Sequence, residues 1–237
     1  AFVAVAVAFF LTAAMRRYAL SRSLVDIPNA RSSHVMPTPR GGGVAIVVTF
    51  LLALGGLIYF DLISLPAFAA CAGAGIIVAM IGFLDDHGHI DARWRLLGHF
   101  LAAAWALYWL GGLPAVNVFG KVLELGWIGT VLALLYLVWM LNLYNFMDGI
   151  DGIAGVEATS VCFSACLLYA LSGQIGSIWA PLMLGAAVAG FLFWNFPPAR
   201  IFMGDAGSGF LGLMFGVLSL QAGWVSAPLL WAWLILL

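Results

Sequence analysis

Charged side chains are scarce in this sequence. Lys, Arg, Asp and Glu together make up 8% of its 237 residues, whereas hydrophobic residues make up 65%. An ordinary soluble domain is about 25% charged. So few charged groups cannot cover the surface of a water-soluble protein of this size, which excludes that class. The composition instead predicts a polytopic integral membrane protein that sits in a lipid bilayer.

Cysteine is also rare, with three residues at positions 71, 162 and 166. All three lie in apolar stretches, their number is odd, and no second cysteine pair completes a metal-binding pattern. We therefore expect buried structural thiols. The net charge of −1 argues neither for nor against nucleic acid, and nucleic acid is not among the partners that we expect.

Long apolar segments fill most of the chain, and a helix needs about 20 apolar residues to cross the hydrocarbon core. Candidate spans lie at roughly 1–15, 44–60, 66–84, 96–112, 125–141, 153–172, 178–194, 208–222 and 226–237. No internal repeat or soluble insertion separates them, and we expect that both ends are truncated. The expected fold is all-α, a polytopic membrane bundle of about nine transmembrane helices in one domain, residues 1–237.

Basic residues are distributed unevenly among the connecting segments. Eight of the nine Lys and Arg lie in segments 16–43, 85–95, 142–152 and 195–207, and the other segments hold only Lys121. The positive-inside rule places the first set of segments in the cytoplasm. Seven aspartates and all four histidines lie in or near the same set, although the rule does not concern them. We therefore expect one polar site on the cytoplasmic face.

The first cytoplasmic segment contains DIPNARSSHVMPTPRGGG, residues 26–43. Its three final glycines allow close backbone approach just before a membrane span. Arg40, beside these glycines, is placed to face a phosphate group. The alternative is a basic turn that anchors the next helix to anionic lipid.

Asp85 and Asp86 end the third span in GFLDDHGHIDARWR. Adjacent carboxylates repel each other, and the C-terminus of a helix carries a negative partial charge. Both effects predict a cation nearby, which is either a divalent metal ion or the guanidinium of Arg93 or Arg95. The alternative is a solvated loop that these arginines neutralise.

Polar residues recur at every third position of NLYNFMDGIDG, namely Asn142, Asn145, Asp148 and Asp151. A three-residue step turns 300° on an α-helix, so these side chains would form a slowly spiralling stripe. Gly149 and Gly152 predict that the helix ends near Asp148. A polar seam between helices explains the asparagines, but acids within a membrane are costly and usually functional.

Asp205 lies in the Gly-rich sequence GDAGSG immediately before another span. Backbone amides at a helix N-terminus favour anions, and a carboxylate beside them suits Mg²⁺ that carries a phosphate. The alternative is ordinary N-capping by Asp205 or Ser208. Together, the four segments offer the carboxylates, amides and arginines that chemistry on phosphates requires.

Four motifs carry a family resemblance: PNARSSHVMPTPRGGG, FLDD, NLYNFMDGIDG and PPARIFMGDAGS. In sequence and order they resemble the polyprenyl-phosphate N-acetylhexosamine-1-phosphate transferase superfamily, of the glycosyltransferase family 4 type, over roughly residues 22–215. The first motif is more similar to the O-antigen-initiating undecaprenyl-phosphate glycosylphosphotransferase branch than to the muramoyl-pentapeptide branch.

The resemblance implies a multi-pass enzyme of the bacterial inner membrane whose active site faces the cytoplasm. It would transfer an N-acetylhexosamine-1-phosphate from a UDP-sugar to undecaprenyl phosphate and release UMP. This would be the first membrane step of O-antigen or teichoic acid-like polysaccharide synthesis. UDP-N-acetylhexosamine and undecaprenyl phosphate are the expected substrates. Mg²⁺ is the expected cofactor with Mn²⁺ as the alternative, and a homodimer is left open.

The resemblance also implies roles for the polar residues. Asp205 and Asn145 would hold the Mg²⁺. Asp85 and Asp86 would be the catalytic acid pair next to the lipid phosphate. Arg95 would contact the diphosphate, at a position where the family often has Lys.

Further substrate-binding residues follow from the same resemblance. Asp151 would contact the uracil, Asp148 would support the site, and Asn195 would lie near the nucleotide. Arg40 and His34 of the first motif complete the expected substrate-binding set. The His-rich loop that the family has near its ninth span is absent from these 237 residues.

Three alternative functions are left open by the sequence. The first is a muramoyl-pentapeptide phosphotransferase of peptidoglycan synthesis. The second is a secondary transporter, because acids within a membrane and broken helices are typical of that class. The third is an inactive scaffold that keeps the fold.

Overall fold

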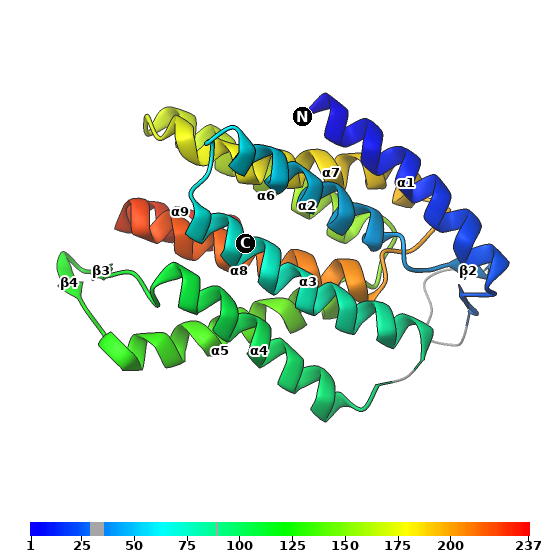
Figure 1. Cartoon of the computed structure of the whole chain (residues 1–237), viewed down its shortest axis with the longest axis horizontal. Coiled ribbons are helices and arrows are strands. Elements are labelled where there is room, and N and C mark those ends of the chain that lie inside the picture. The colour runs from blue at the N-terminus through cyan, green and yellow to red at the C-terminus, as the bar shows by residue number, and fades with distance from the viewer. Residues whose placement is uncertain (29–35, 89) are drawn as a thin grey trace.

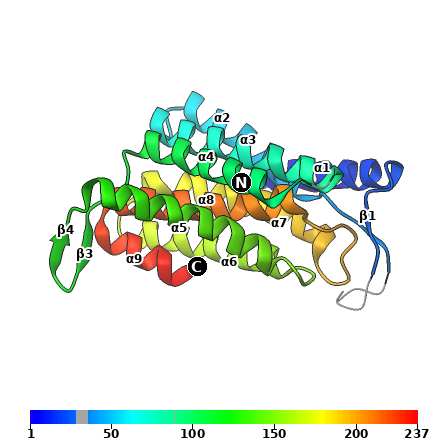
Figure 2. The ribbon, with the colours of Figure 1, turned by 90° about the horizontal axis from the view of Figure 1, so that it is seen from below.

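The computed structural model describes residues 1–28, 36–88 and 90–237, so the predicted substrate-binding residue His34 lies outside the described residues. Nine α-helices within these ranges form a bundle (Figures 1 and 2), which confirms the predicted all-α class. The helices are α1 (Phe2–Ser21), α2 (Gly43–Tyr59), α3 (Leu65–His87), α4 (Ala92–Leu110), α5 (Gly126–Met147), α6 (Ile153–Leu171), α7 (Trp179–Asn195), α8 (Asp205–Val225) and α9 (Ala227–Leu236).

Six helical segments are long and apolar enough to cross a membrane, judged by length and composition. They are Phe2–Ser21, Leu65–His87, Gly126–Met147, Ile153–Leu171, Ile175–Asn195 and Asp205–Val225. α2 and α9 are apolar but shorter, and α4, which begins with the charged stretch ARWR, is not among the six. The bundle therefore has the form of a polytopic membrane protein.

Two short antiparallel strand pairs lie at opposite ends of the bundle (Figure 1). One pair joins β1 (Val25–Asp26) to β2 (Thr38–Pro39), and the other joins β3 (Val116–Val118) to β4 (Lys121–Leu123). The segment after β2 is also held by the link between α7 and α8. Phe202 N donates to Pro39 O at 2.8 Å, and Gly42 N donates to Phe202 O at 2.9 Å. These bonds fix the turn that carries Arg40.

α8 is the central helix of the bundle. Its residues from Ala206 to Leu220 are all buried, and a helix that is hydrophobic on every side belongs inside a protein. α3 and α5 pack along it, and α2 and α9 also contact it. The chain places one end of this buried helix, at Asp205, beside the predicted polar site.

Two of the three cysteines are buried as predicted, Cys71 and Cys162, and all three are free thiols. Cys166 is only half-buried, because its side chain lies toward the turn before α7, where Sγ is 3.7 Å from Ile178 O.

Glycines bring three helices into close contact at the start of α8. A Cβ atom on Gly43 would lie 2.3 Å from the Cα atom of Gly207 and 2.7 Å from its nitrogen. A Cβ atom on Gly82 would lie 2.5 Å from the nitrogen of Ala206. Real Cβ atoms do not approach backbone atoms so closely, so only glycine permits this packing of α2 and α3 on α8.

We expect Gly43→Ala to destabilise the protein by about 1–3 kcal/mol, because the new methyl group must push α2 away from the α8 backbone. Gly55→Ala is the matched control, since Gly55 lies on the same helix and a Cβ atom there would meet nothing within 4 Å. Thermal unfolding in detergent measures both variants. Equal melting temperatures for Gly43→Ala and Gly55→Ala would contradict the close contact.

Candidate functional site

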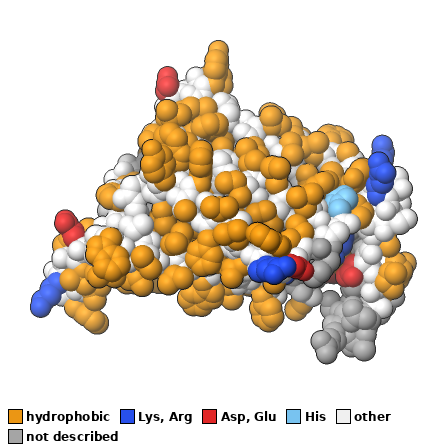
Figure 3. Space-filling model, turned by 60° about the horizontal axis from the view of Figure 1, so that its bottom comes forward, with side chains coloured by type: hydrophobic (Ala, Val, Ile, Leu, Met, Phe, Trp, Pro, Cys, Tyr) orange, Lys and Arg blue, Asp and Glu red, His pale blue; other side chains and the backbone are white. Residues whose placement is uncertain are grey.

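The predicted polar segments meet at one end of the bundle, where α3 and α5 end and α8 begins (Figure 1). Figure 3 shows a face that is covered mainly by hydrophobic side chains, with basic, acidic and histidine side chains toward its right-hand end and a few other charged side chains at the left and at the top. Segments that are more than a hundred residues apart in the sequence are therefore neighbours here.

Asp86 connects three of these segments. Its buried carboxylate accepts hydrogen bonds from Arg40, through Nη2 and through Nε at 3.0 Å. It also accepts from the backbone nitrogens of Asp205 at 3.2 Å and Ala206 at 3.4 Å. Burial alone would lower the pKa of Arg40, but the charge and hydrogen bonds of Asp86 raise it overall. Asp86 thus holds the Arg40 turn against the N-terminus of α8.

The N-terminus of α8 is capped from another helix. Its N-cap position is Gly204, which offers no side chain, and α8 has no side-chain cap of its own. The Ser208 hydroxyl donates to the Gly204 carbonyl at 3.1 Å. The alternative of ordinary N-capping by Asp205 or Ser208 is therefore wrong, because the Asp86 carboxylate takes that place.

Arg95 lies between two carboxylates. Its Nη1 is 2.5 Å from Oδ2 of Asp85 and 3.5 Å from Oδ2 of Asp205. Of the cations that the sequence predicted beside the acid pair, Arg95 pairs with Asp85, whereas Asp86 pairs with Arg40, which was not among them. Arg93 pairs with neither acid of the pair, since its guanidinium is exposed and pairs with another, exposed acid. Arg93 points away because it lies on the other side of α4.

A pocket of about 210 Å³ lies between α3, α4, α5 and α8. Asp85, Arg95, Asn145 and Asp205 line its polar part together with His99 and Asn142, and mainly apolar residues line the rest. Asn145 Nδ2 donates to Oδ1 of Asp205 at 3.2 Å and to Oγ of Ser208 at 2.8 Å. The structure therefore gathers four predicted site residues in one pocket, and Asp86 lies outside its lining.

The residues of this pocket fit a divalent cation that binds together with a substrate. Among the described residues, no three His, Cys, Asp or Glu side chains form a group that could hold a metal ion. Mg²⁺ commonly takes one or two carboxylates, with water and substrate phosphates as its other ligands. Asp85 and Asp205 both pair with Nη1 of Arg95, so their carboxylates lie close together, and a divalent cation would offset the negative charge that Arg95 leaves. Asn145 adds an amide oxygen once its amide group turns.

Asp148 follows the last residue of α5 and is only partly exposed. Burial, together with the negative charges of Asp205 and Asp86, raises the pKa of Asp148 to about 7. No hydrogen bond to its side chain occurs within the part of the chain that the structure describes. Asp148 is thus an unpaired carboxyl group beside the pocket, and its predicted supporting role stays a prediction.

We expect the stability of the protein to fall between about pH 4 and 7, because the folded state keeps the proton of Asp148 while the unfolded state has released it. Asp148→Asn should remove this loss, which we put at about 2 kcal/mol because partial exposure weakens the effect. Melting temperatures at pH 5 and pH 8 without divalent metal measure it. A variant that follows the same pH profile as the unchanged protein would contradict the prediction.

Asp151 and Asn195 connect two links between helices. Oδ2 of Asp151 accepts from Ala199 N at 2.8 Å. Asn195 is buried, its Oδ1 accepts from Gly152 N at 3.1 Å, and its Nδ2 donates to Ile201 O at 3.1 Å. Both residues hold the α5–α6 link against the α7–α8 link. Their predicted contacts with uracil and nucleotide stay predictions.

Comparisons with known proteins identify the family of this chain. The model of the family described as Glycosyl transferase family 4 matches residues 68–223. A probable undecaprenyl-phosphate N-acetylglucosaminyl 1-phosphate transferase of Bacillus subtilis is 32% identical over 92% of this chain. A decaprenyl-phosphate N-acetylglucosaminephosphotransferase of Mycolicibacterium smegmatis is 34% identical over 91%. A phospho-N-acetylmuramoyl-pentapeptide-transferase of Streptococcus thermophilus is 29% identical over 76%.

The matched regions cover 61%, 57% and 57% of these three relatives, so the chain spans about three fifths of their length. The family match covers well over half of the chain and includes the ends of α3 and α5 and the start of α8. This chain belongs to the glycosyl transferase family 4, within the superfamily of polyprenyl-phosphate sugar-1-phosphate transferases that its motifs predicted.

Proposed function

We propose that the protein transfers an N-acetylhexosamine-1-phosphate from a UDP-sugar to undecaprenyl phosphate and releases UMP. The names of the relatives support a polyprenyl phosphate and an N-acetylglucosamine phosphate as the reacting groups. The observation that carries the proposal is the pocket in which Asp85, Arg95, Asn145 and Asp205 converge at one end of an apolar bundle. Such a place suits a lipid substrate that meets a water-soluble one.

In the proposed reaction, an oxygen of the lipid phosphate attacks the β-phosphorus of the UDP-sugar. The bond between this phosphorus and the bridging oxygen breaks, and UMP leaves with the electron pair. Arg95 binds the diphosphate oxygens, and Asp205 and Asn145 would hold Mg²⁺. When bound, the metal ion would supply positive charge that stabilises phosphate oxygens.

The structure separates the two members of the acid pair. Asp85 lines the pocket, whereas the carboxylate of Asp86 is occupied by Arg40 and by the backbone of α8. We therefore assign contact with the lipid phosphate to Asp85, and positioning of the pocket walls to Asp86. A phosphate monoester is largely ionised near neutral pH, so its direct attack needs little help from a base.

Direct attack predicts that the enzyme does not exchange labelled UMP into the UDP-sugar when lipid phosphate is absent. We expect such exchange to be below about 1% of the rate of the complete reaction, because each step then requires both substrates. Incubation with radiolabelled UMP, with and without undecaprenyl phosphate, measures this. Fast lipid-independent exchange with a trapped phosphosugar on Asp85 would support a covalent intermediate instead.

We place the site on the cytoplasmic face of a bacterial inner membrane, because basic residues gather at that end. We assign the enzyme to the O-antigen-initiating branch, because the first motif is closer to that branch.

An assay with radiolabelled UDP-N-acetylglucosamine, undecaprenyl phosphate and Mg²⁺ tests the reaction through a lipid product. Product only from UDP-muramoyl-pentapeptide would favour the peptidoglycan alternative. No product from any UDP-sugar would favour a scaffold. A transporter is less well supported, since the acids lie at one end of the bundle.

A further inference from the structure

A second pocket lies at the other end of the bundle. It has a volume of about 340 Å³ and is enclosed by the link from α2 to α3, the end of α4, the turn before α7 and the end of α8. Gln221 lines it 16 residues after Asp205 on α8, which is about 24 Å along the helix axis. The volume is in the range of sites for small organic ligands, and the pocket does not touch the proposed reaction site.

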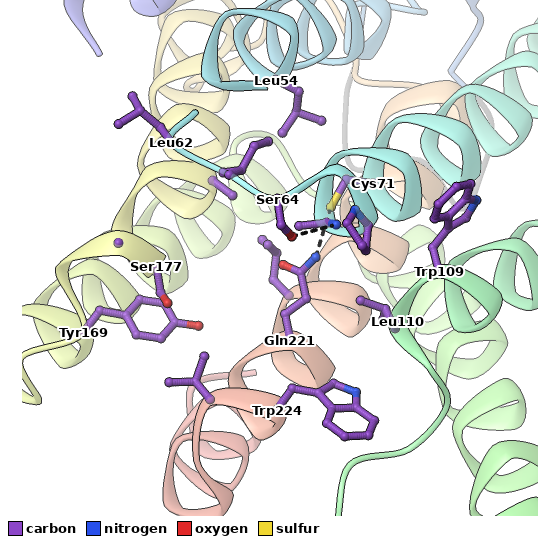
Figure 4. Close-up of a pocket in the computed structure, with 17 residues that line it drawn as sticks. Leu54, Leu62, Ser64, Cys71, Trp109, Leu110, Tyr169, Ser177, Gln221 and Trp224 are labelled. Carbon is purple, nitrogen blue, oxygen red and sulfur yellow. Dashed lines mark hydrogen bonds between the residues drawn. The ribbon is translucent and has the colours of Figure 1, made fainter. Parts of the chain in front are cut away.

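None of the described residues that line this pocket is charged. Most of the lining is apolar, and polar groups from separate elements reach into it (Figure 4), namely Ser64, Tyr169, Ser177 and Gln221. A ligand of this pocket is therefore uncharged where it is bound, with an apolar body and a few hydrogen-bonding atoms. This chemistry excludes a nucleotide or a phosphate group as the part of the ligand that enters.

Two of these polar side chains, Gln221 and Tyr169, have hydrogen-bonding atoms that no other described residue uses. Within the described residues, the amide of Gln221 has one hydrogen bond, from Nε2 to Sγ of Cys71 at 3.9 Å, and a thiol is a weak acceptor. The Tyr169 hydroxyl accepts from the indole of Trp233 at 3.0 Å, which leaves its own proton to donate. The pocket thus offers donors that suit carbonyl oxygens.

The level at which the pocket lies in the bilayer indicates a membrane lipid as its ligand. Exposed aromatic side chains surround this end of the bundle, namely Tyr59, Tyr108, Trp127, Trp224 and Trp231. Tyr and Trp are enriched at the level where a bilayer meets water, and the ester groups of glycerolipids lie at that level. The lining of the pocket combines apolar surface for an acyl chain with donors for an ester carbonyl.

We propose that this pocket binds one glycerophospholipid, with an acyl chain against the apolar lining and an ester carbonyl hydrogen-bonded to Gln221 and Tyr169. The lipid is a structural ligand at the end of the bundle that is remote from the reaction. Because the pocket has no charged lining, it holds zwitterionic and anionic phospholipids equally well. Its preference is for the ester linkage.

Native mass spectrometry of the protein in mild detergent tests this proposal. Diacyl phosphatidylethanolamine and its diether analogue with the same chains are added in turn. We expect one retained lipid, with at least about fivefold tighter retention of the ester form, the effect of one hydrogen bond. Gln221→Leu should bring the two forms within about twofold of each other, without a change in transferase activity.

Two variants serve as comparisons. Gln174→Leu makes the same substitution at an exposed glutamine near the same end that does not line the pocket, and it should keep the ester preference. Ala67→Phe places a ring in the pocket and should displace the lipid. Equal retention of ester and ether lipids by the unchanged protein, or an ester preference that survives Gln221→Leu, would overturn the proposal. A protein that carries only detergent and no bound lipid under these conditions would overturn it too.

Discussion

We expect Asp205→Asn to lower the transferase activity by at least about a hundredfold, which is the effect of losing one electrostatic stabiliser in an active site. The variant keeps a side chain of the same shape but loses the negative charge that we propose binds Mg²⁺. Asp205 also faces Asn145 and Arg95 within the pocket, so the site is affected at its centre. The lipid-product assay at several Mg²⁺ concentrations measures the effect.

The folding of Asp205→Asn should be almost unchanged. The ion pair with Arg95 is long, at 3.5 Å, and both side chains are about one-third exposed, so its loss costs less than about 1 kcal/mol. Asp91→Asn is the matched control, since Asp91 is an exposed acid at the same end of the bundle, and it should keep full activity. Near-normal activity of Asp205→Asn at low Mg²⁺ would remove the metal assignment.

The sequence predicted the helices well, because they depend on local patterns, and four of the predicted site residues line one pocket. Runs of apolar residues mark membrane helices wherever they occur. The predicted end of the helix near Asp148 is confirmed, since α5 ends at Met147 and α6 begins at Ile153. The uneven distribution of charged residues also indicated correctly that four distant segments share one end of the bundle.

The contacts between these segments could not be predicted in the same way. Arg40 pairs with Asp86 over 46 residues, and Asp86 caps a helix that begins 119 residues later. A local pattern indicates how deep a residue lies in the membrane and on which face of its helix, but it does not identify the residue with which its charge will pair. Arg93 and Arg95 are two residues apart, so they project in different directions from α4, and only Arg95 reaches the pocket.

One signal in the sequence did indicate the close packing. The glycines before α2 suggested an approach of two backbones, and their partner is Gly207 on α8. What the sequence lacked was the identity of this partner.

We expect Asp86→Ala to reduce the free energy of unfolding by about 3 kcal/mol and to lower the activity in parallel. The change leaves Arg40 without its partner in a partly buried place, and breaking a buried ion pair from one side costs about 3–5 kcal/mol. It also removes the cap from the backbone nitrogens of Asp205 and Ala206. Thermal unfolding in detergent measures the first effect, and the lipid-product assay measures the second.

A double-mutant cycle with Arg40→Ala separates the two roles of Asp86, the ion pair with Arg40 and the cap on the N-terminus of α8. If the ion pair dominates, the double variant should be no less stable than Asp86→Ala alone, because no unpaired guanidinium remains. If the helix cap dominates, Asp86→Asn should recover part of the stability, since its amide oxygen still accepts from the α8 backbone. An Asp86→Ala protein that melts like the unchanged protein but has lost its activity would contradict the positioning role. Asp86 would then act in the reaction itself, beside Asp85.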